Sequence, residues 1–273
     1  MNPSDLSAPV KVAAVQMVSA PDVASNLAAA DALVAQAAGE GAQVVLLPEY
    51  FCLMGRHDTD KVGVREADGH GPIQDFLANA ASRHGVWLIG GTLPLECPSP
   101  HQVYNTTLVF DPQGARRARY DKIHLFGFRR GDEAYDESTT ILAGREPVAF
   151  DAPCGRVGLS VCYDLRFPEL YRGLGTLDLI VVPAAFTYTT GQAHWEILLR
   201  ARAIENQCYV LASAQGGKHP NGRRTWGHSM LIDPWGEILA VQAEGAGVVW
   251  GEIDPTRLQE VRAALPALRH RVF

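Results

Sequence analysis

The sequence predicts an α/β fold, and two observations lead to this prediction. Stretches with the composition of strands and helices alternate almost from end to end. Two apolar runs that end in proline, 44–48 and 179–183, each close a strand–helix–strand stretch, which indicates two similar α/β halves packed sheet to sheet. No low-complexity linker divides the chain, so we expect residues 1–273 to form a single domain.

In the first half of the chain, we expect strands at 10–17, 43–47, 86–90, 104–110 and 118–122, and helices at 24–38 and 72–84. The run at 43–47 is continuously apolar, which is typical of a strand buried on both faces. The helix at 72–84 begins with proline directly after Gly71. Residues 123–147 are polar and are expected to form an irregular connection, and one of that length is usually functional or mobile.

In the second half, we expect strands at 156–161, 179–182, 209–213, 227–232, 237–241 and 247–253. Helices are expected at 168–174 and 193–206, and a last one after Pro255. The residues 233–236, Asp-Pro-Trp-Gly, supply a turn between two of these strands.

Composition excludes several classes of function. The chain has 24 Lys and Arg against 30 Asp and Glu, and a net charge of −6 argues against nucleic-acid binding. The basic cluster Arg116, Arg117 and Arg119 is therefore expected to be a solvated strand edge. Residues 1–5 lack the regions of a signal peptide, and no apolar run is long enough to cross a membrane. We expect a cytoplasmic protein without membrane or nucleic-acid partners.

The number and spacing of the cysteines also favour a reducing, cytoplasmic setting. There are five, an odd number, and no Cys-x-x-Cys pair occurs, so neither a disulfide framework nor a zinc ribbon is predicted. The nine histidines have no metal-binding spacing. Serine-hydrolase, P-loop and dinucleotide-binding motifs are also absent from the sequence. We therefore expect no metal and no cofactor, and one of the five thiols is a candidate for a chemical role.

Three polar residues follow predicted strands, where ligands bind in α/β sheets: Glu49, Lys122 and Cys162. Taken singly, Glu49 reads as a helix cap or ion-pair partner, Lys122 as a surface lysine at a strand end, and Cys162 as a core residue. Cys162 is still the best candidate nucleophile, because it precedes a predicted helix start whose dipole favours a thiolate. Cys208 is more plainly a core residue. A Cys162–His228 pair stays open.

In order and spacing, these residues resemble the nitrilase superfamily of carbon–nitrogen hydrolases over nearly the whole chain. Three motifs carry the resemblance: Leu46-Leu47-Pro48-Glu49, Tyr120-Asp121-Lys122-Ile123-His124-Leu125 and Gly158-Leu159-Ser160-Val161-Cys162-Tyr163-Asp164-Leu165-Arg166-Phe167-Pro168-Glu169. The resemblance implies a four-layer α-β-β-α sandwich, a homodimer or higher homo-oligomer, and a catalytic triad of Glu49, Lys122 and Cys162. It also implies a second catalytic glutamate at Glu137, a residue that could equally cap a local turn.

Tyr163-Asp164 after the candidate nucleophile is similar to the Nit branch of amidases. This implies cofactor-free hydrolysis of a small carboxylated amide to an acid and ammonia through a thioester. Deaminated glutathione is the expected substrate and α-ketoglutaramate, or another small amide, the alternative. A nitrile-cleaving enzyme and a catalytically silent binding module are further alternatives. Cys162 would be the nucleophile, Glu49 the base and Lys122 the oxyanion-stabilising cation.

Six further residues are candidates to bind substrate. Arg166 and the pair Arg129-Arg130 are candidates to hold a carboxylate, although Arg166 could instead pair with Glu169 in the next helical turn. Tyr163 offers a backbone N–H beside the nucleophile. Phe186 and Thr187, just beyond the strand at 179–182, are expected to line the pocket.

Overall fold

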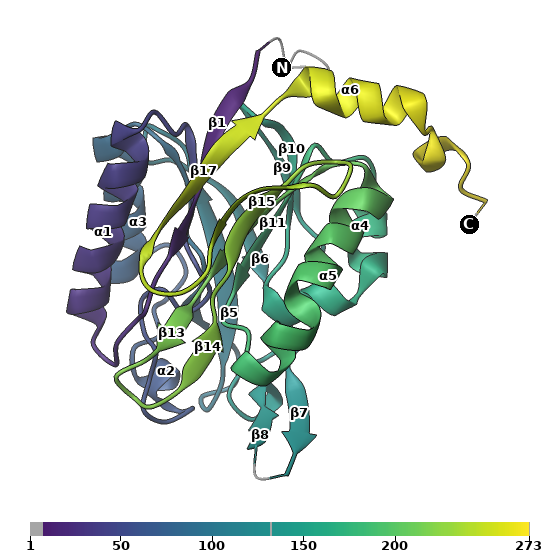
Figure 1. The fold of residues 1–273 in the computed structure, drawn as a ribbon. Coiled ribbons are helices and arrows are strands. Elements are labelled where there is room, and N and C mark those ends of the chain that lie inside the picture. Colours follow the sequence, from purple (N-terminus) through teal and green to yellow (C-terminus); the bar gives the residue numbers. More distant parts are fainter. Residues whose placement is uncertain (1–7, 132, 273) are drawn as a thin grey trace.

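Two β-sheets lie face to face, and helices cover the outer face of each (Figure 1). The structure is a computed structural model that describes residues 8–131 and 133–272. Helices α1 (Val23–Gly39) and α3 (Pro72–His84) pack on the first sheet. Helices α4 (Pro168–Gly173) and α5 (Tyr188–Asn206) lie on the opposite side of the molecule. The expected four-layer α-β-β-α sandwich is confirmed.

The first sheet has a parallel centre with antiparallel flanks. Its strand order is β17 (Gly247–Ile253), β1 (Val10–Gln16), β2 (Val44–Leu46), β3 (Trp87–Ile89), β5 (Val103–Phe110) and β4 (Leu93–Glu96). Strand β6 (Arg116–Asp121) also pairs with β5. Among the described strands of this sheet, only β1, β2 and β3 run parallel to one another.

The second sheet repeats this plan. Its order is β16 (Ile238–Gln242), β15 (Ser229–Ile232), β12 (Tyr209–Ala214), β11 (Leu179–Ala184), β10 (Gly155–Leu159) and β9 (Ala149–Ala152). Strands β10, β11 and β12 are parallel, and the outer strands are antiparallel. The two proline-ended runs thus form β2 and β11, each the middle strand of a parallel trio, which agrees with the predicted pair of similar halves.

The first sheet contributes side chains to two hydrophobic clusters, one on each of its faces. Val12 and Ala14 of β1 join the cluster that fills the space between the sheets. Their neighbours Ala13 and Val15 join the cluster under α1 and α3. Because successive side chains of a strand point to opposite faces, an apolar run such as β1 is buried on both sides.

The segment 123–147 is more ordered than predicted. It contains the hairpin of β7 (Gly127–Arg130) and β8 (Glu133–Asp136), which projects from the body of the sandwich (Figure 1), and the short helix η1 (Glu137–Thr139). Helix α5 also begins five residues before the predicted start. The hydroxyl of Thr187 accepts a hydrogen bond from the backbone N–H of Thr190 there and caps the helix.

Several short elements were not expected from the sequence: α2 (Asp60–Gly63), β13 (Gly216–Lys218) and β14 (Arg224–Trp226), besides β4 and β9. The chain closes with α6 (Pro255–Ala264) and η3 (Ala267–Arg269), which extend from one end of the sandwich (Figure 1). Runs of three or four residues carry too little periodicity to be recognised before folding.

The basic cluster is ion-paired at the β6 edge, as expected of a solvated strand edge. Arg116 and Arg119 pair with Asp68, and Arg117 pairs with Asp111. Within the described ranges, no helix is long and apolar enough to cross a membrane. No group of three or more potential metal ligands occurs in that part of the chain either. The segment 1–5, where no signal peptide was expected, lies outside the described residues.

Candidate active site

Three strand ends bring a carboxylate, an ammonium and a thiol together between the sheets. Glu49 follows β2, Lys122 follows β6, and Cys162 follows β10 and opens the short helix η2 (Cys162–Arg166). Lys122 Nζ lies 2.9 Å from Glu49 Oε1. The Cys162 thiol and the Glu49 carboxylate lie in the wall of one cleft, close enough to shift each other's pKa. All three side chains are buried. The first sheet supplies the acid and the lysine, and the second sheet supplies the thiol.

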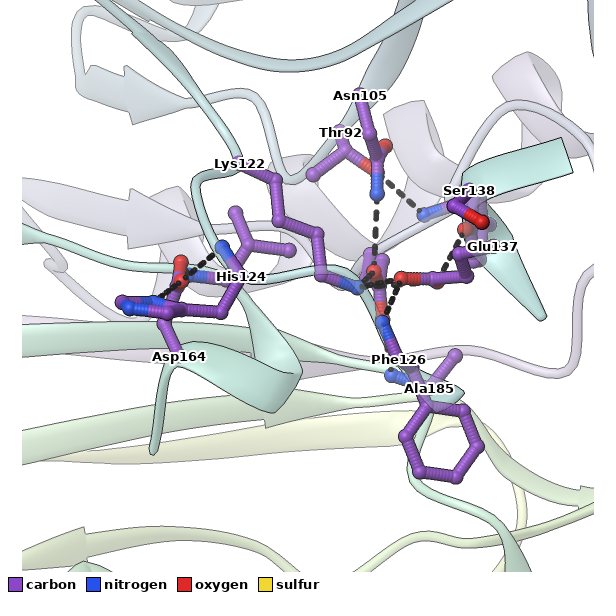
Figure 2. Close-up of polar contacts among 12 residues, drawn as sticks. Thr92, Asn105, Lys122, His124, Phe126, Glu137, Ser138, Asp164 and Ala185 are labelled. Atoms are coloured by element: carbon purple, nitrogen blue, oxygen red, sulfur yellow. Dashed lines mark hydrogen bonds and ion pairs between the residues drawn. The ribbon is translucent and has the colours of Figure 1, made fainter. Parts of the chain in front are cut away.

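Three donors fix the Glu49 carboxylate. Oε1 accepts hydrogen bonds from Lys122 Nζ and, at 3.0 Å, from Asn105 Nδ2 of β5 (Figure 2). Oε2 accepts one at 2.9 Å from the backbone N–H of Ala185, the residue after β11. Because these donors come from both sheets, they hold the carboxylate in one orientation.

Glu137 lies on the other side of Lys122. Lys122 Nζ is 3.0 and 2.7 Å from the two Glu137 oxygens, so the ammonium lies between two carboxylates (Figure 2). The Tyr50 hydroxyl and the Phe126 backbone N–H also donate to Glu137, at 2.9 and 2.7 Å. The predicted second glutamate therefore joins the cluster in space, although it lies in the segment that was expected to be irregular.

The charged groups of the cluster shift one another's pKa values. Burial alone lowers the pKa of a lysine, but Glu137 and Glu49 outweigh it and hold the Lys122 pKa well above its ordinary value. Burial likewise opposes ionisation of Glu137, but Lys122 lowers its pKa below the ordinary range. For Glu49, burial prevails over Lys122 and raises the pKa. Lys122 and Glu137 thus form a fixed ion pair, and Glu49 is the carboxylate suited to exchange a proton.

Burial opposes the thiolate form of Cys162. Burial and then the Glu49 charge raise its pKa well above the ordinary value, and Lys122 only partly opposes them. These two effects act against the thiolate that the helix start was expected to favour, and the reactivity of Cys162 stays a prediction.

Close backbone packing holds two of the strand ends. A Cβ at Gly91, which has φ +51°, would lie 2.1 Å from the Pro48 carbonyl oxygen, one residue before Glu49. A Cβ at Gly144 would lie 2.1 Å from the Asp121 carbonyl oxygen, one residue before Lys122. Both approaches exclude any larger residue. These glycines let the loops pack directly behind Glu49 and Lys122.

The turn at Cys162 is strained and is held by Asp164. Cys162 has φ +50°, a left-handed conformation that costs a non-glycine residue about 1–3 kcal/mol. The buried Asp164 carboxylate accepts hydrogen bonds from the Val161 backbone N–H at 2.8 Å and the Tyr120 hydroxyl at 2.7 Å. It also accepts one from the His124 backbone N–H at 3.0 Å (Figure 2). Asp164 thereby links the nucleophile turn to β6.

We expect Asp164→Ala to lower the free energy of unfolding by about 3–5 kcal/mol, because it leaves several buried donors without an acceptor. Urea unfolding measures this change. Asp151→Ala is the matched control, since Asp151 is 58% exposed and pairs with Arg156 only at the surface, and it should cost less than about 1 kcal/mol. Equal stability of the two variants would contradict the bracing role of Asp164.

A cleft of about 850 Å³, including the part open to solvent, leads to Glu49 and Cys162. Besides these two residues, its wall includes three cations, Lys61, Arg223 and Arg224. A smaller cavity of about 200 Å³ adjoins Cys162 and is lined by the predicted residues Tyr163, Phe186 and Thr187. The structure therefore brings these three predicted substrate residues to the thiol.

The structure does not bring Arg166 to either cavity. Its guanidinium lies 3.3 Å from His194 Nδ1 of α5 and stacks on the rings of Tyr163 and Phe186, at 5.7 and 5.5 Å. The ion pair with Glu169 is not formed among the described residues either. Stacking on the two rings and contact with α5 hold the Arg166 charge outside both cavities, and its role as a carboxylate ligand stays a prediction.

The other candidates also lie elsewhere. Arg129 and Arg130 are exposed on the β7 strand and are not part of the cleft wall. His228 Nδ1 lies 2.9 Å from the Trp226 carbonyl oxygen and its ring stacks on Trp226, so the open Cys162–His228 pair is replaced by Cys162–Glu49. Cys208 is buried in the core, as expected.

Sequence reasoning missed Asn105, Tyr50 and Lys61. Asn105 and its two threonine neighbours are buried polar residues within an otherwise apolar strand, and that break in pattern was the available signal. Tyr50 has φ +56° directly after Glu49, which no sequence pattern announces. Lys61 lies in a region without recognisable periodicity.

The two stacked sheets and the buried thiol–carboxylate–ammonium cluster between them have the architecture of a hydrolase. The model of the carbon–nitrogen hydrolase family matches residues 11–263. The chain is 45% identical to a deaminated glutathione amidase from Synechocystis over 97% of this chain and 99% of the relative. It is 38% identical to an omega-amidase from Xenopus laevis over 96% of this chain and 94% of the relative.

Among solved structures, the NitFhit protein of Caenorhabditis elegans superposes with a TM-score of 0.88 at 38% identity. The match covers 97% of this chain and 65% of NitFhit, so the chain spans about two thirds of that protein. The chain belongs to the carbon–nitrogen hydrolase family. It is accordingly a hydrolase of carbon–nitrogen bonds other than peptide bonds.

Proposed function

We propose that the chain is an amidase that uses Cys162 as its nucleophile and Glu49 as its base. The observation that carries the proposal is the buried Glu49 carboxylate, which is hydrogen-bonded to the Lys122 ammonium and lies with the Cys162 thiol in the wall of one cleft. An amide is a weak electrophile, so its hydrolysis needs an activated nucleophile, a proton carrier and stabilisation of the oxyanion. Cys162, Glu49 and Lys122 are proposed to meet these three needs in that order.

In the first half of the reaction, Glu49 takes the thiol proton while Cys162 Sγ bonds to the amide carbon. Glu49 then gives this proton to the amide nitrogen as the carbon–nitrogen bond breaks, which releases a neutral amine and leaves a thioester. In the second half, Glu49 removes a proton from water as its oxygen attacks the thioester. The thiolate leaves and recovers a proton, and the acid is released.

Lys122 is the proposed oxyanion donor. Its ammonium lies beside the thiol, and Glu137 holds it charged and oriented. The backbone N–H of Tyr163 is the proposed second donor, since it directly follows the nucleophile. Donors of this kind contribute about 3–4 kcal/mol each to the transition state. Tyr163, Phe186 and Thr187 are proposed to contact the substrate through the smaller cavity.

We propose deaminated glutathione as the substrate, because the amidase so named is the more similar of the two relatives. Its scissile amide joins an α-ketoglutaryl group to cysteinylglycine, so the amine released is cysteinylglycine and not ammonia. Ammonia is released from a primary amide such as α-ketoglutaramate, the alternative substrate that the omega-amidase relative supports. Both reactions give α-ketoglutarate, and both substrates are small carboxylated amides.

The proposal is tested with purified protein and three substrates: deaminated glutathione, α-ketoglutaramate and a simple nitrile. We expect α-ketoglutarate release from deaminated glutathione with a kcat/KM at least about tenfold above that for α-ketoglutaramate, and no ammonia from the nitrile. The reverse order would select omega-amidase activity. No turnover of any of them would favour a binding module and overturn the proposal.

The remaining expectations are proposals as well. We propose a single catalytic domain over residues 1–273, a cytoplasmic location and a homodimer or higher homo-oligomer. Seven large apolar side chains are exposed in the described chain, and they favour the oligomer: Ile197, Ile204, Trp235, Leu239, Val241, Leu265 and Val272. The molar mass in solution would test it.

A further inference from the structure

A lysine that takes no part in the proposed chemistry lies in the wall of the active-site cleft. Lys61 is carried by α2, and its Nζ donates a hydrogen bond to the Thr140 hydroxyl at 3.0 Å. The ammonium also lies 5.8 Å from the centroid of the Tyr50 ring, over its face. These two contacts orient the ammonium, and the hydrogen bond to Thr140 uses one of its three donors.

Lys61 differs from the other cations of the cleft wall because it has no acidic partner. Arg223 lies 3.8 Å from Asp58, and Arg224 lies 3.4 Å from Glu244. In the ranges that the structure describes, no carboxylate oxygen lies within 4.0 Å of Lys61 Nζ. Burial lowers the Lys61 pKa, and the more distant charges of Asp58 and Glu137 only partly oppose this. A largely buried, unpaired ammonium is costly, and an anion would relieve that cost.

We propose that Lys61 binds a carboxylate of the substrate. This inference rests on the proposed function and adds the residue that recognises the charge. Deaminated glutathione has two carboxylates, one on the α-ketoglutaryl side and one on the glycine of the leaving group. α-Ketoglutaramate has only the first. Both place a carboxylate a few bonds from the scissile amide, so a cation in the wall of the cleft that holds Cys162 suits either.

Lys61 has one other conceivable role, which is to support Glu137. Tyr50 carries the ring under the Lys61 ammonium and donates its hydroxyl to Glu137 at 2.9 Å. Loss of the Lys61 charge could therefore act through Glu137 on Lys122. Such an effect would change kcat for every amide, charged or neutral, whereas loss of a carboxylate contact changes KM for carboxylated amides alone.

The test compares Lys61→Met, which removes the charge at nearly constant length, with Lys61→Arg, which keeps it. Lys218→Met is the matched control, because Lys218 is exposed on β13 and lies outside the cleft wall. We expect Lys61→Met to raise KM for carboxylated substrates about 10-fold to 100-fold. Pentanamide, a neutral amide, should keep its kcat/KM within about twofold. Lys61→Arg should recover part of the loss, and Lys218→Met should behave like the unsubstituted enzyme.

The two substrates locate the carboxylate. A raised KM for both places it on the α-ketoglutaryl side, and a raised KM for deaminated glutathione alone places it on the glycine side. An unchanged KM for both, or an equal loss on pentanamide, would overturn the inference while leaving the amidase function intact.

A binding measurement separates this inference from the proposed function. Calorimetric titration with the products, α-ketoglutarate and cysteinylglycine, needs no turnover. We expect one of them to bind the unsubstituted protein and to bind Lys61→Met at least about tenfold more weakly. Equal affinity for both proteins, or no binding of either product, would count against a carboxylate site at Lys61. Failure of hydrolysis with this difference in binding intact would instead refute only the amidase proposal.

Discussion

Cys162→Ala is expected to lower kcat for the preferred amide on the order of 10⁶-fold, since removal of the nucleophile in a covalent hydrolase leaves only binding and oxyanion stabilisation. Without Sγ no thioester can form, and Glu49 has no proton to transfer to the amine in the first step. The substitution removes one sulfur atom from the cleft wall and leaves the other lining residues in place, so substrate affinity should remain close to normal. Single-turnover assays with enzyme in excess over substrate measure the loss.

The matched control is Cys154→Ala, which removes a buried thiol at the turn between β9 and β10, outside the cleft wall. Burial raises the pKa of Cys154 to about 12, as expected of an unreactive core thiol. Its activity should stay within about twofold, and both variants should unfold cooperatively in a thermal melt. Near-normal activity of Cys162→Ala in folded protein would refute the assignment of the nucleophile.

Alkylation is a second test of the reactivity of the Cys162 thiol. Cys97 is partly exposed and would react with iodoacetamide for reasons of access alone, so the experiment belongs in a Cys97→Ser background. In that background, Cys162 should be the thiol that is modified, and substrate should protect it. Uniformly slow labelling without protection would favour a silent binding module.

Glu49→Gln is expected to lower kcat/KM by about 10²–10⁴-fold, the usual contribution of a general acid–base. The substitution keeps the shape of the side chain but removes the site that accepts the thiol proton. Acylation should stop, so no thioester should accumulate when the reaction is quenched and analysed by mass spectrometry. Rapid build-up of the thioester in this variant would assign the base elsewhere.

The pH dependence of kcat/KM is a further test of Glu49 as the base. Burial raises the Glu49 pKa above its ordinary value of 4.5, and the base must be ionised to accept a proton. The kcat/KM of the unsubstituted enzyme should therefore fall as the pH drops through that raised pKa. Glu49→Gln should lose this acid limb along with most of its activity. An unchanged limb would mean that another group controls it.

Glu49→Gln also has a structural consequence. The carboxylate accepts hydrogen bonds from Lys122, Asn105 and the Ala185 backbone, all of them donors. A glutamine side chain has only one acceptor oxygen for these donors, and its NH2 group would face the remaining N–H donors. This should cost about 1–3 kcal/mol of stability. Urea unfolding measures this cost, and activity is then compared at a temperature where both proteins are folded.

Much of the fold was predictable because its elements carry strong local patterns. Helix α3 begins at Pro72 and ends at His84, with both bounds as predicted, and strand β17 likewise matches at 247–253. Short elements such as β13 and β14 are exceptions, because they exist through pairing with each other and not through periodicity. The hairpin of β7 and β8 was missed for the same reason, and polar composition was taken for lack of structure.

The sequence by itself determined the alternation of strands and helices, and the strand ends at Glu49, Lys122 and Cys162. Those properties follow from local hydrophobic patterns and motif spacing. Only the tertiary structure decided that Glu49 lies between the thiol and the ammonium, that Asp164 holds the nucleophile turn, and that Arg166 lies outside the cavities. It also brought Lys61 to the cleft. The physical reason is that distance, burial and charge pairing between residues far apart in the chain arise only when the two sheets stack.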